Sequence, residues 1–386
     1  MPTSVSVRRM VAAVAVAAGL AAVAPAPAAQ AGPRPDEVQR SIETLVGPGR
    51  YPGVLAAVRD RQGRAKHYTA GVGDLRSGAP VPVNGQVRIG SASKMFLAVV
   101  VLQLAGEGKL GLDESVETYL PGVVHGTGFE PDRITVRHLL QHTSGLPDYT
   151  EVMFTVVPGT ELPDFFATRH RYHEPRALID LALTAEPGPV GAGWAYSNTG
   201  YVLAGLIAQK VTGRPLAELI TTRVIDRIGL RDTYVPGVGE QRVRGPHPLG
   251  YQRVPGGDLR DFTVMDPSWG WGAGQVVSTP GDLNTFLRAL LDGKILGPAQ
   301  LRQMRTVVDL GEGAGYGLGL MRAPLTCGGV AWGHGGDIPG YSTLDWATDD
   351  GRAVTLTVTA MTGSLRDSSV SGARGGIVDA ALCAGR

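Results

Sequence analysis

Cysteine, aromatic residues and unbalanced charge are all scarce in this chain. The 386 residues include 2 cysteines and 6% aromatic residues, and the formal net charge is +1. The basic residues are scattered and the net charge is small, whereas proteins that bind nucleic acids or membrane surfaces carry clustered positive charge. No fixed period is present, which excludes collagen-like and repeat folds. We therefore expect a globular protein with no nucleic-acid partner.

Two common hydrolase signatures are also missing. No serine lies in the Gly-x-Ser-x-Gly turn that α/β-hydrolase esterases require. His170 and His173 stand close together, but no carboxylate or third histidine follows at a spacing typical of a metal site. A polar loop is the simpler interpretation of this pair. We expect neither a metal nor another cofactor.

The amino-terminal 31 residues predict a signal peptide. Arg8 and Arg9 precede the uncharged apolar run 10–24, and Ala29-Gln30-Ala31 offers small residues for cleavage. The run is too short to span a membrane comfortably, and a membrane anchor is the alternative interpretation. No later stretch reaches about 18 apolar residues. We expect a secreted, extracellular protein that is cleaved near Ala31 and has no stable membrane anchor.

The two cysteines, Cys327 and Cys383, are an even number in a chain with an export signal. This combination favours a disulfide between them, with two buried free thiols as the alternative. Such a bond would restrict the unfolded chain and contribute roughly 4 kcal/mol on the chain-entropy model.

Strand-like sequence lies near both ends of the chain, and helical sequence lies between. Short β-like runs follow an opening helix over 34–45, a long apolar helix begins at Gly90, and a closing helix covers 377–383. We predict an α/β (α+β) fold, in which an antiparallel sheet formed by both chain ends is flanked by helices and carries an inserted helical region. The predicted strands are 54–59, 65–72, 317–322, 330–334, 341–348 and 353–360. The predicted domains are an α/β domain of residues 32–105 and 275–386 and a mainly helical domain of residues 106–274.

The strongest local motif is Ser91-Ala92-Ser93-Lys94 at the start of the long apolar helix. Positions three apart share a helix face, so Lys94 can reach the hydroxyl of Ser91. A serine hydroxyl becomes a good nucleophile when a neighbouring base takes its proton, and a desolvated lysine can be that base. The alternative is that Ser91 caps the helix and Lys94 is solvated.

Two further polar groups recur downstream. Tyr196 and Asn198 precede a predicted helix, where a tyrosine can relay a proton and an asparagine can bind a substrate amide. His334-Gly335-Gly336 ends a predicted strand, and its glycines let a substrate lie close to the backbone. The alternatives are a helix cap for the first group and a lone histidine before a turn for the second.

The order Ser-x-x-Lys, Tyr-x-Asn and His-x-Gly resembles the serine penicillin-recognising enzymes, which are class C β-lactamase-like. Over nearly all of the chain after the signal peptide it is most similar to the secreted, soluble D-alanyl-D-alanine carboxypeptidases. Both cysteines also fall where that type carries a disulfide. The runs that carry the similarity are 88–94, 102–104, 107–110, 119–122, 133–137, 144–146, 196–199 and 316–320.

The resemblance implies a role for each motif residue. Ser91 would attack the carbonyl, and Lys94 and Tyr196 would move its proton to the leaving group. Asn198 would hold the acyl-side amide, and His334 would support Tyr196 electrostatically. The implied substrate-contacting residues are the backbone N–H groups of Ser91 and Asp337 as oxyanion hole, the close-approach glycines Gly335 and Gly336, and Phe154 and Trp269 as walls of the acyl pocket.

The chain departs from the carboxypeptidases where they bind a free carboxylate. Gly335 and Asp337 occupy the positions of their two hydroxyl residues, and Met321 that of an arginine. Arg322 is adjacent, but neighbours on a strand point to opposite faces, so a bulge would be needed to re-aim it. Asp337 would repel a carboxylate.

We therefore expect a serine hydrolase of the D-alanyl-D-alanine carboxypeptidase type. Its partners would be a D-amino-acid peptide, amide or ester as substrate and β-lactams as inhibitors. The alternatives are a D-aminopeptidase, a D-amino-acid amidase or an esterase of the same fold, a β-lactamase, and a non-catalytic penicillin-binding-like module.

Overall fold

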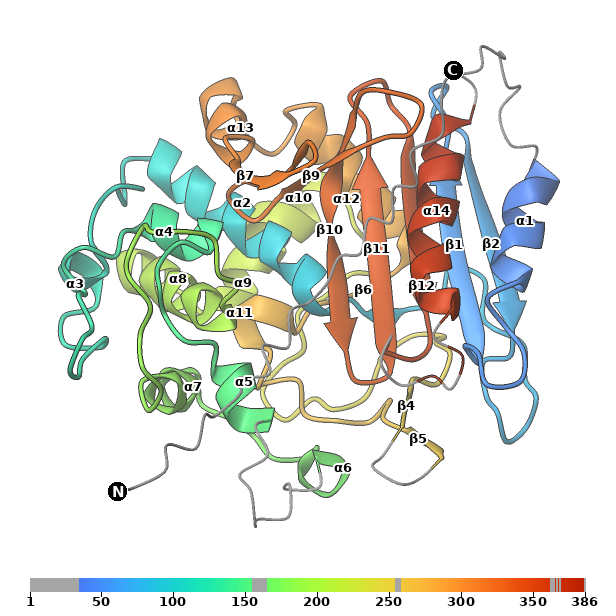
Figure 1. Ribbon diagram of the computed structural model, residues 1–386, viewed down its shortest axis with the longest axis horizontal. Helices are drawn as coiled ribbons and strands as arrows, with labels where there is room; N and C mark the ends of the chain where they lie inside the picture. The colour runs from blue at the N-terminus through green and yellow to red at the C-terminus, as the bar shows by residue number, and fades with distance from the viewer. Residues whose placement is uncertain are drawn as a thin grey trace, which may run out of the picture.

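A large mixed fold is seen in the computed structural model, which describes residues 35–154, 165–253, 258–361, 365, 367 and 369–384. The predicted signal peptide lies outside the described residues. An eight-stranded antiparallel sheet has the order β2-β1-β12-β11-β10-β9-β8-β7 (Figure 1). Its strands are β1 (Gly53–Arg59), β2 (Ala65–Gly71), β7 (Val308–Gly311), β8 (Ala314–Tyr316), β9 (Met321–Pro324), β10 (Val330–Ile338), β11 (Tyr341–Ala347) and β12 (Ala353–Val358).

The sheet joins both ends of the chain through the pairing of β1 with β12. This confirms the predicted fold class, including the hairpin of β1 and β2 and the turn between β11 and β12. Two short ribbons complete the strands. They are β3 (Val87–Arg88) with β6 (Val277–Ser278), and β4 (Tyr251–Arg253) with β5 (Leu259–Asp261).

Helices fill most of the chain between the two groups of strands, and the predicted domain boundaries near residues 105 and 275 stay a prediction. Helix α2 is apolar on all sides, and Met95 through Leu102 have no exposed surface, as expected of a helix surrounded by other elements. The helices are α1 (Pro35–Glu43), η1 (Gly90–Ala92), α2 (Ser93–Gly106), α3 (Val116–Tyr119), α4 (Val136–Gln141), α5 (Tyr149–Phe154), α6 (Phe165–Thr168), α7 (Pro175–Ala182), α8 (Asn198–Thr212), α9 (Leu216–Ile220), η2 (Thr221–Ile225), α10 (Asp226–Ile228), α11 (Trp271–Gly274), α12 (Pro280–Leu291), α13 (Pro298–Met304) and α14 (Ser369–Cys383).

The sheet separates two hydrophobic cores. On one face, α2, α8 and α12 pack in the larger core. On the other face, α1 packs on β2, and α14 packs on β11 and β12 (Figure 1). The predicted disulfide is confirmed, because Cys327 in the β9–β10 turn is bonded to Cys383 at the end of α14. The last helix is therefore attached covalently to the sheet that it covers.

One predicted strand is wrong. The run 317–322 was expected to be continuous, but the chain turns between β8 and β9, where Gly317 donates its N–H to the Leu320 carbonyl at 2.8 Å. Gly319 has φ +74°, which glycine adopts at little cost. The turn reverses the chain, so that β9 pairs antiparallel with β8 and Tyr316 lies opposite Met321.

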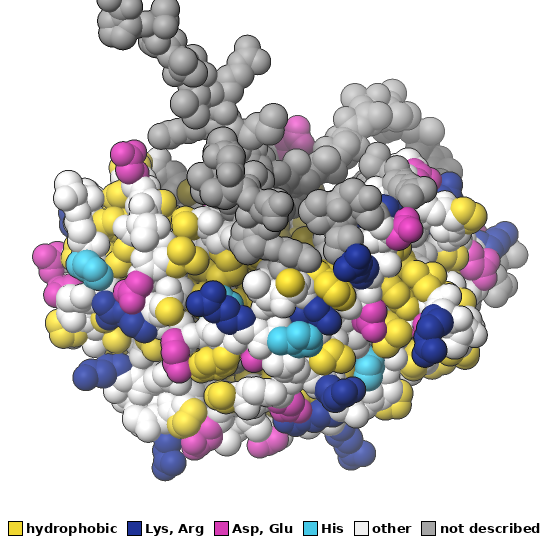
Figure 2. Space-filling view, turned by 90° about the horizontal axis from the view of Figure 1, so that it is seen from below, with side chains coloured by type: hydrophobic (Ala, Val, Ile, Leu, Met, Phe, Trp, Pro, Cys, Tyr) yellow, Lys and Arg dark blue, Asp and Glu magenta, His cyan; other side chains and the backbone are white. Residues whose placement is uncertain are grey.

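The described surface is evenly charged. Figure 2 shows Lys and Arg side chains interspersed with Asp and Glu over one face, in keeping with the formal net charge of +1. Among the described residues, no helix is both long and apolar enough to cross a membrane.

Asp345 on β11 is an unusual acid because it is fully buried. Burial raises the pKa of its carboxyl well above the ordinary value, and the nearby backbone N–H groups of His334 and Asp345 offset this only in part. Neither carboxyl oxygen has a hydrogen-bond partner of good geometry among the described residues. The folded protein thus holds a proton on Asp345 that the unfolded chain releases.

We predict that Asp345→Asn stabilises the protein, and more so at pH 8 than at pH 4. The unfolding free energy of the wild type falls as pH rises above 3.8, the ordinary pKa, toward the raised folded-state pKa, and the amide removes this loss. The expected gain in Tm is a few degrees at pH 8. Thermal unfolding across pH measures it, with Asp132→Asn, an exposed acid, as control. A gain that is the same at both pH values contradicts the prediction.

Candidate active site

Ser91 lies in the turn of η1, immediately before α2. The preceding Gly90 has φ +50°, and a Cβ there would lie 2.6 Å from the Asp337 carbonyl oxygen. Gly336 is equally constrained, since its Cβ would lie 1.9 Å from the Ile89 oxygen. Two glycines therefore let strand β10 pack directly against the turn that presents Ser91.

Lys94 on the first turn of α2 is fully buried beside Ser91. Its Nζ lies 2.9 Å from Ser91 Oγ, 2.7 Å from Asn198 Oδ1 and 2.9 Å from the Ala273 carbonyl oxygen. Burial lowers the pKa of Lys94 to about 7, and the charge of Asp148 opposes this shift. An appreciable fraction of Lys94 is thus neutral at physiological pH.

The hydrogen-bond partners fit a neutral amine. Asn198 Oδ1 and the Ala273 carbonyl can only accept, so they take the two N–H bonds of a neutral Lys94. In the neutral form the amine lone pair can accept the Ser91 hydroxyl proton across the 2.9 Å contact through which the ammonium form donates, while Ser91 Oγ accepts from Tyr196 Oη at 2.7 Å. Each group has a complementary partner in this arrangement, and it is the arrangement required for proton transfer from Ser91.

Tyr196 and Asn198 come from the segment that enters α8. Burial raises the pKa of Tyr196 well above its ordinary value, with further contributions from Tyr316, Asp148 and Asp337, so its hydroxyl keeps its proton. Asn198 donates from Nδ2 to Asp148 Oδ2 at 2.8 Å, which fixes its amide so that Oδ1 faces Lys94. The sequence predictions for Ser91, Lys94, Tyr196 and Asn198 thus converge in one hydrogen-bonded cluster.

His334 is buried on β10, but its bonded partner is Tyr316 and not Tyr196. The Tyr316 hydroxyl lies 2.9 Å from His334 Nε2, and His334 Nδ1 contacts the Gly335 carbonyl oxygen. Burial, reinforced by Lys94, lowers the pKa of His334 to about 3. The ring is therefore neutral, and the predicted electrostatic support of Tyr196 by His334 stays a prediction.

His142, which ends α4, is a site residue that sequence reasoning missed. Its Nδ1 accepts from the Ser197 N–H at 3.1 Å, and its Nε2 lies 3.1 Å from the Tyr316 hydroxyl. Its ring also packs on Tyr196 with centroids 4.2 Å apart. Burial lowers the pKa of His142 well below the ordinary value, so its Nε2–H donates to Tyr316, which donates to His334. A polar, uncharged chain thus supports Tyr196 from behind.

Of the predicted substrate-contacting side chains Phe154, Trp269 and Arg322, only the first two lie together. Phe154, 40% exposed, meets Trp269 edge-on with ring centroids 5.9 Å apart. Arg322 lies opposite Trp332 on β10 and donates to the Gly313 carbonyl at 3.0 Å. From Trp332 to Asp337 a strand rises roughly 16 Å, so Arg322 does not reach Asp337. The geometry therefore removes Arg322 from the site.

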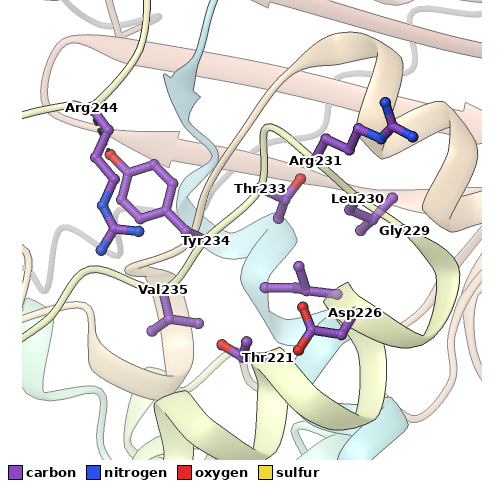
Figure 3. A pocket seen from close by; sticks show the side chains of 10 residues that line it. Thr221, Asp226, Gly229, Leu230, Arg231, Thr233, Tyr234, Val235 and Arg244 are labelled. Atoms are coloured by element: carbon purple, nitrogen blue, oxygen red, sulfur yellow. Dashed lines mark hydrogen bonds between the residues drawn. The ribbon is translucent and has the colours of Figure 1, made fainter.

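A separate cavity of about 530 Å³ lies around α10 (Figure 3). Arg244 stacks on the Tyr234 ring at 4.0 Å and pairs with Glu240 at 2.6 Å, so its charge is already compensated. None of the motif residues lines this cavity, and we assign it no part in the chemistry. It is lined by Thr221, Ile225, Asp226, Gly229, Leu230, Arg231, Thr233, Tyr234, Val235 and Arg244.

No group of His, Cys, Asp or Glu in the described ranges could hold a metal ion.

The sequence of this chain matches the family model described as Beta-lactamase over residues 38–373. The chain belongs to this family, and with it to the serine penicillin-recognising superfamily. It is 30% identical to a penicillin-binding protein of Bacillus subtilis over 80% of this chain and 67% of that protein. It is 27% identical to a D-aminopeptidase of Brucella anthropi, of which it spans 57%.

Solved structures show the same relationship. A D-stereospecific amidohydrolase from Streptomyces sp. superposes with a TM-score of 0.78 at 36% identity, covering 88% of this chain and 97% of that one. A D-amino acid amidase from Ochrobactrum anthropi SV3, complexed with L-phenylalanine amide, gives a TM-score of 0.75 at 27% identity, covering 89% and 96%. The chain is a hydrolase of the β-lactamase fold.

The pKa of Lys94 predicts the pH dependence of acylation. Because the neutral amine accepts the Ser91 proton, kcat/KM for an uncharged ester should rise about tenfold per pH unit below 7 and level off above it. Stopped-flow acylation between pH 5 and 9 measures the profile. Lys94→Arg should lose several orders of magnitude, since a guanidinium cannot act as base. A flat wild-type profile through pH 7 contradicts a Lys94 base.

Proposed function

We propose that the chain is a secreted serine hydrolase that acts through an acyl-enzyme on D-amino-acid amides, peptides or esters. The observation that carries the proposal is that Ser91 Oγ is hydrogen-bonded both to Lys94 Nζ at 2.9 Å and to Tyr196 Oη at 2.7 Å. A nucleophile bonded to a neutral base and to a protonated relay can both lose a proton and pass one on. The disulfide supports secretion, because such bonds persist outside the cytoplasm.

The proposed reaction has two balanced steps. In acylation, Ser91 Oγ bonds to the substrate carbonyl carbon, its proton passes to Lys94, and Tyr196 delivers a proton to the departing amine or alcohol while being reprotonated from Lys94. In deacylation, water adds its hydroxyl to the acyl carbon, and its proton returns to Ser91 as the acid leaves. The backbone N–H groups of Ser91 and Asp337 would stabilise the oxyanion in both steps.

The acyl part of the substrate would lie toward Asn198, with Phe154 and Trp269 as apolar walls. The same acyl-enzyme chemistry makes β-lactams the expected inhibitors. The similarity to a D-stereospecific amidohydrolase and a D-amino acid amidase supports D-amino-acid acyl groups.

D-alanyl-D-alanine carboxypeptidase activity is the second candidate, because long runs of sequence resemble such enzymes. The leaving-group side disfavours it. Gly335 and Asp337 offer no hydroxyl for a carboxylate, and Arg322 is bonded to Gly313. We therefore place amides and esters before peptides with a free carboxylate.

Ser91→Ala should abolish labelling by a fluorophosphonate and reduce ester hydrolysis by at least four orders of magnitude, because no nucleophile remains. Intact-protein mass spectrometry after labelling measures the loss. Thermal unfolding confirms that the variant is folded, and Ser115→Ala, a helix cap away from the cluster, is the control. Labelling that persists in folded Ser91→Ala removes the proposal.

The leaving-group side predicts a preference against carboxylates. A carboxylate about 4 Å from Asp337 faces about 4 kcal/mol of repulsion at an effective dielectric of 20, near a thousandfold in binding as an upper bound for an exposed acid. We expect a D-alanyl-D-alanine peptide to be a poor substrate beside its terminal amide. Asp337→Thr, more clearly with Gly335→Thr, should narrow the difference in kcat/KM. A wild type that prefers the free carboxylate restores the carboxypeptidase assignment.

A further inference from the structure

The carboxylate of Asp337 is held from behind the sheet by a buried relay. Ser342 on β11 is the cross-strand partner of Asp337 and donates its hydroxyl to Asp337 Oδ1. Arg374 on α14 donates from Nη1 to Ser342 Oγ at 2.6 Å. Because Ser342 accepts from a guanidinium, its own proton is free to be donated to the carboxylate.

Ser342 and Arg374 are buried, but Asp337 is exposed. The guanidinium lies 5.7 Å from the Tyr51 ring centroid, and the disulfide at Cys383 ties α14 down. None of the ion pairs among the described residues includes Asp337. One carboxylate oxygen is therefore fixed, no cationic nitrogen of the described residues lies within 4 Å of the carboxylate, and Arg374 acts on it only through Ser342.

Asp337 lies at the edge of the candidate active site, and its side chain projects to the face of β10 opposite to that of Gly336. The Asp337 backbone touches Gly90, the residue before Ser91. Its carboxylate is close enough to contribute to the raised pKa of Tyr196, after burial and nearer groups. A Cβ on Gly335 would meet only Leu344 and Thr343, at the ordinary contact distances of 3.5 and 3.7 Å, so the space beside this residue is not tightly filled.

The proposed acyl-side residues come from elsewhere. Asn198 begins α8 and Phe154 ends α5, whereas Asp337 comes from β10. We infer that Asp337 is a specificity-determining residue that selects substrates whose leaving group carries a positive charge, such as a primary ammonium or a guanidinium. This inference rests on the proposed acyl-enzyme function and adds the chemical class of the leaving group to it.

The test uses three amides of D-phenylalanine that differ only in the end of the leaving amine. The amines are 1,4-diaminobutane, pentylamine and 4-aminobutyrate, which end in an ammonium, a methyl and a carboxylate. We expect wild-type kcat/KM to be about five- to tenfold higher for the ammonium than for the methyl amide, as for a partly exposed charge pair. It should be lower again for the carboxylate. The preference should shrink between 0.05 and 0.5 M salt.

Asp337→Asn keeps the shape and should bring the ammonium-to-methyl ratio to about one, whereas Asp132→Asn, an exposed acid before α4, should keep the wild-type ratio. Arg374→Gln should raise the ratio, because removing the guanidinium behind Ser342 leaves the negative charge of Asp337 less compensated. Thermal unfolding of each variant reports on folding. If Asp337→Asn is misfolded, the salt dependence in the wild type decides the matter.

Two outcomes overturn the inference. One is a wild type that shows no charge preference, and the other is a preference that survives in folded Asp337→Asn. In either case fluorophosphonate labelling of Ser91 and ester hydrolysis would still stand, so the proposed function is judged separately. Failure of Ser91 labelling in the wild type removes the proposed function and this inference together.

Discussion

The burial of the Lys94 amine is the constraint on which the rest of the site depends. A buried amine needs a hydrogen-bond partner for each N–H and for its lone pair, and here the three partner oxygens come from η1, α8 and α11. Those segments lie far apart in the sequence and belong to the sheet end and to the helical region. Moving η1, α8 and α11 apart would break the hydrogen bonds of Lys94. This one side chain therefore links the packing of these three segments to the activation of Ser91.

The surroundings of Lys94 keep further positive charge out. His142 and His334 are both buried and neutral, and the Tyr316 hydroxyl links them. A cation in either place would oppose protonation of Lys94 still further and would cost more to bury. A histidine in the third motif therefore supplies hydrogen bonding where a lysine would supply charge. Around Tyr196, the candidate site is therefore polar mostly through neutral hydrogen-bonding groups and not through charged side chains.

Much of this arrangement could be predicted from sequence because it depends on local spacing. The three-residue step from Ser91 to Lys94 fixes their contact on any helix start. The antiparallel sheet followed from β-like runs at both chain ends. The disulfide was predicted from an even number of cysteines together with the predicted export signal.

What sequence could not give depends on register and on packing between distant elements. Tyr316 meets His334 only because the chain turns at Gly317–Leu320, where glycines had been taken for part of a strand. His142 has no spacing that links it to the motifs, although a polar run at a helix end was a weak signal. Strand alternation would have put the acid Asp345 on a solvated face, but both faces of this central strand are covered.

The attachment of α14 gives the protein a second route to new specificity. Arg374 on this helix reaches through Ser342 to the edge of the site. Mutations in α14 can therefore change which substrates the protein accepts while the reacting groups stay unchanged. Related proteins with this fold can change specificity through residues on the α14 side of the sheet. Relatives with identical motifs therefore need not share substrates.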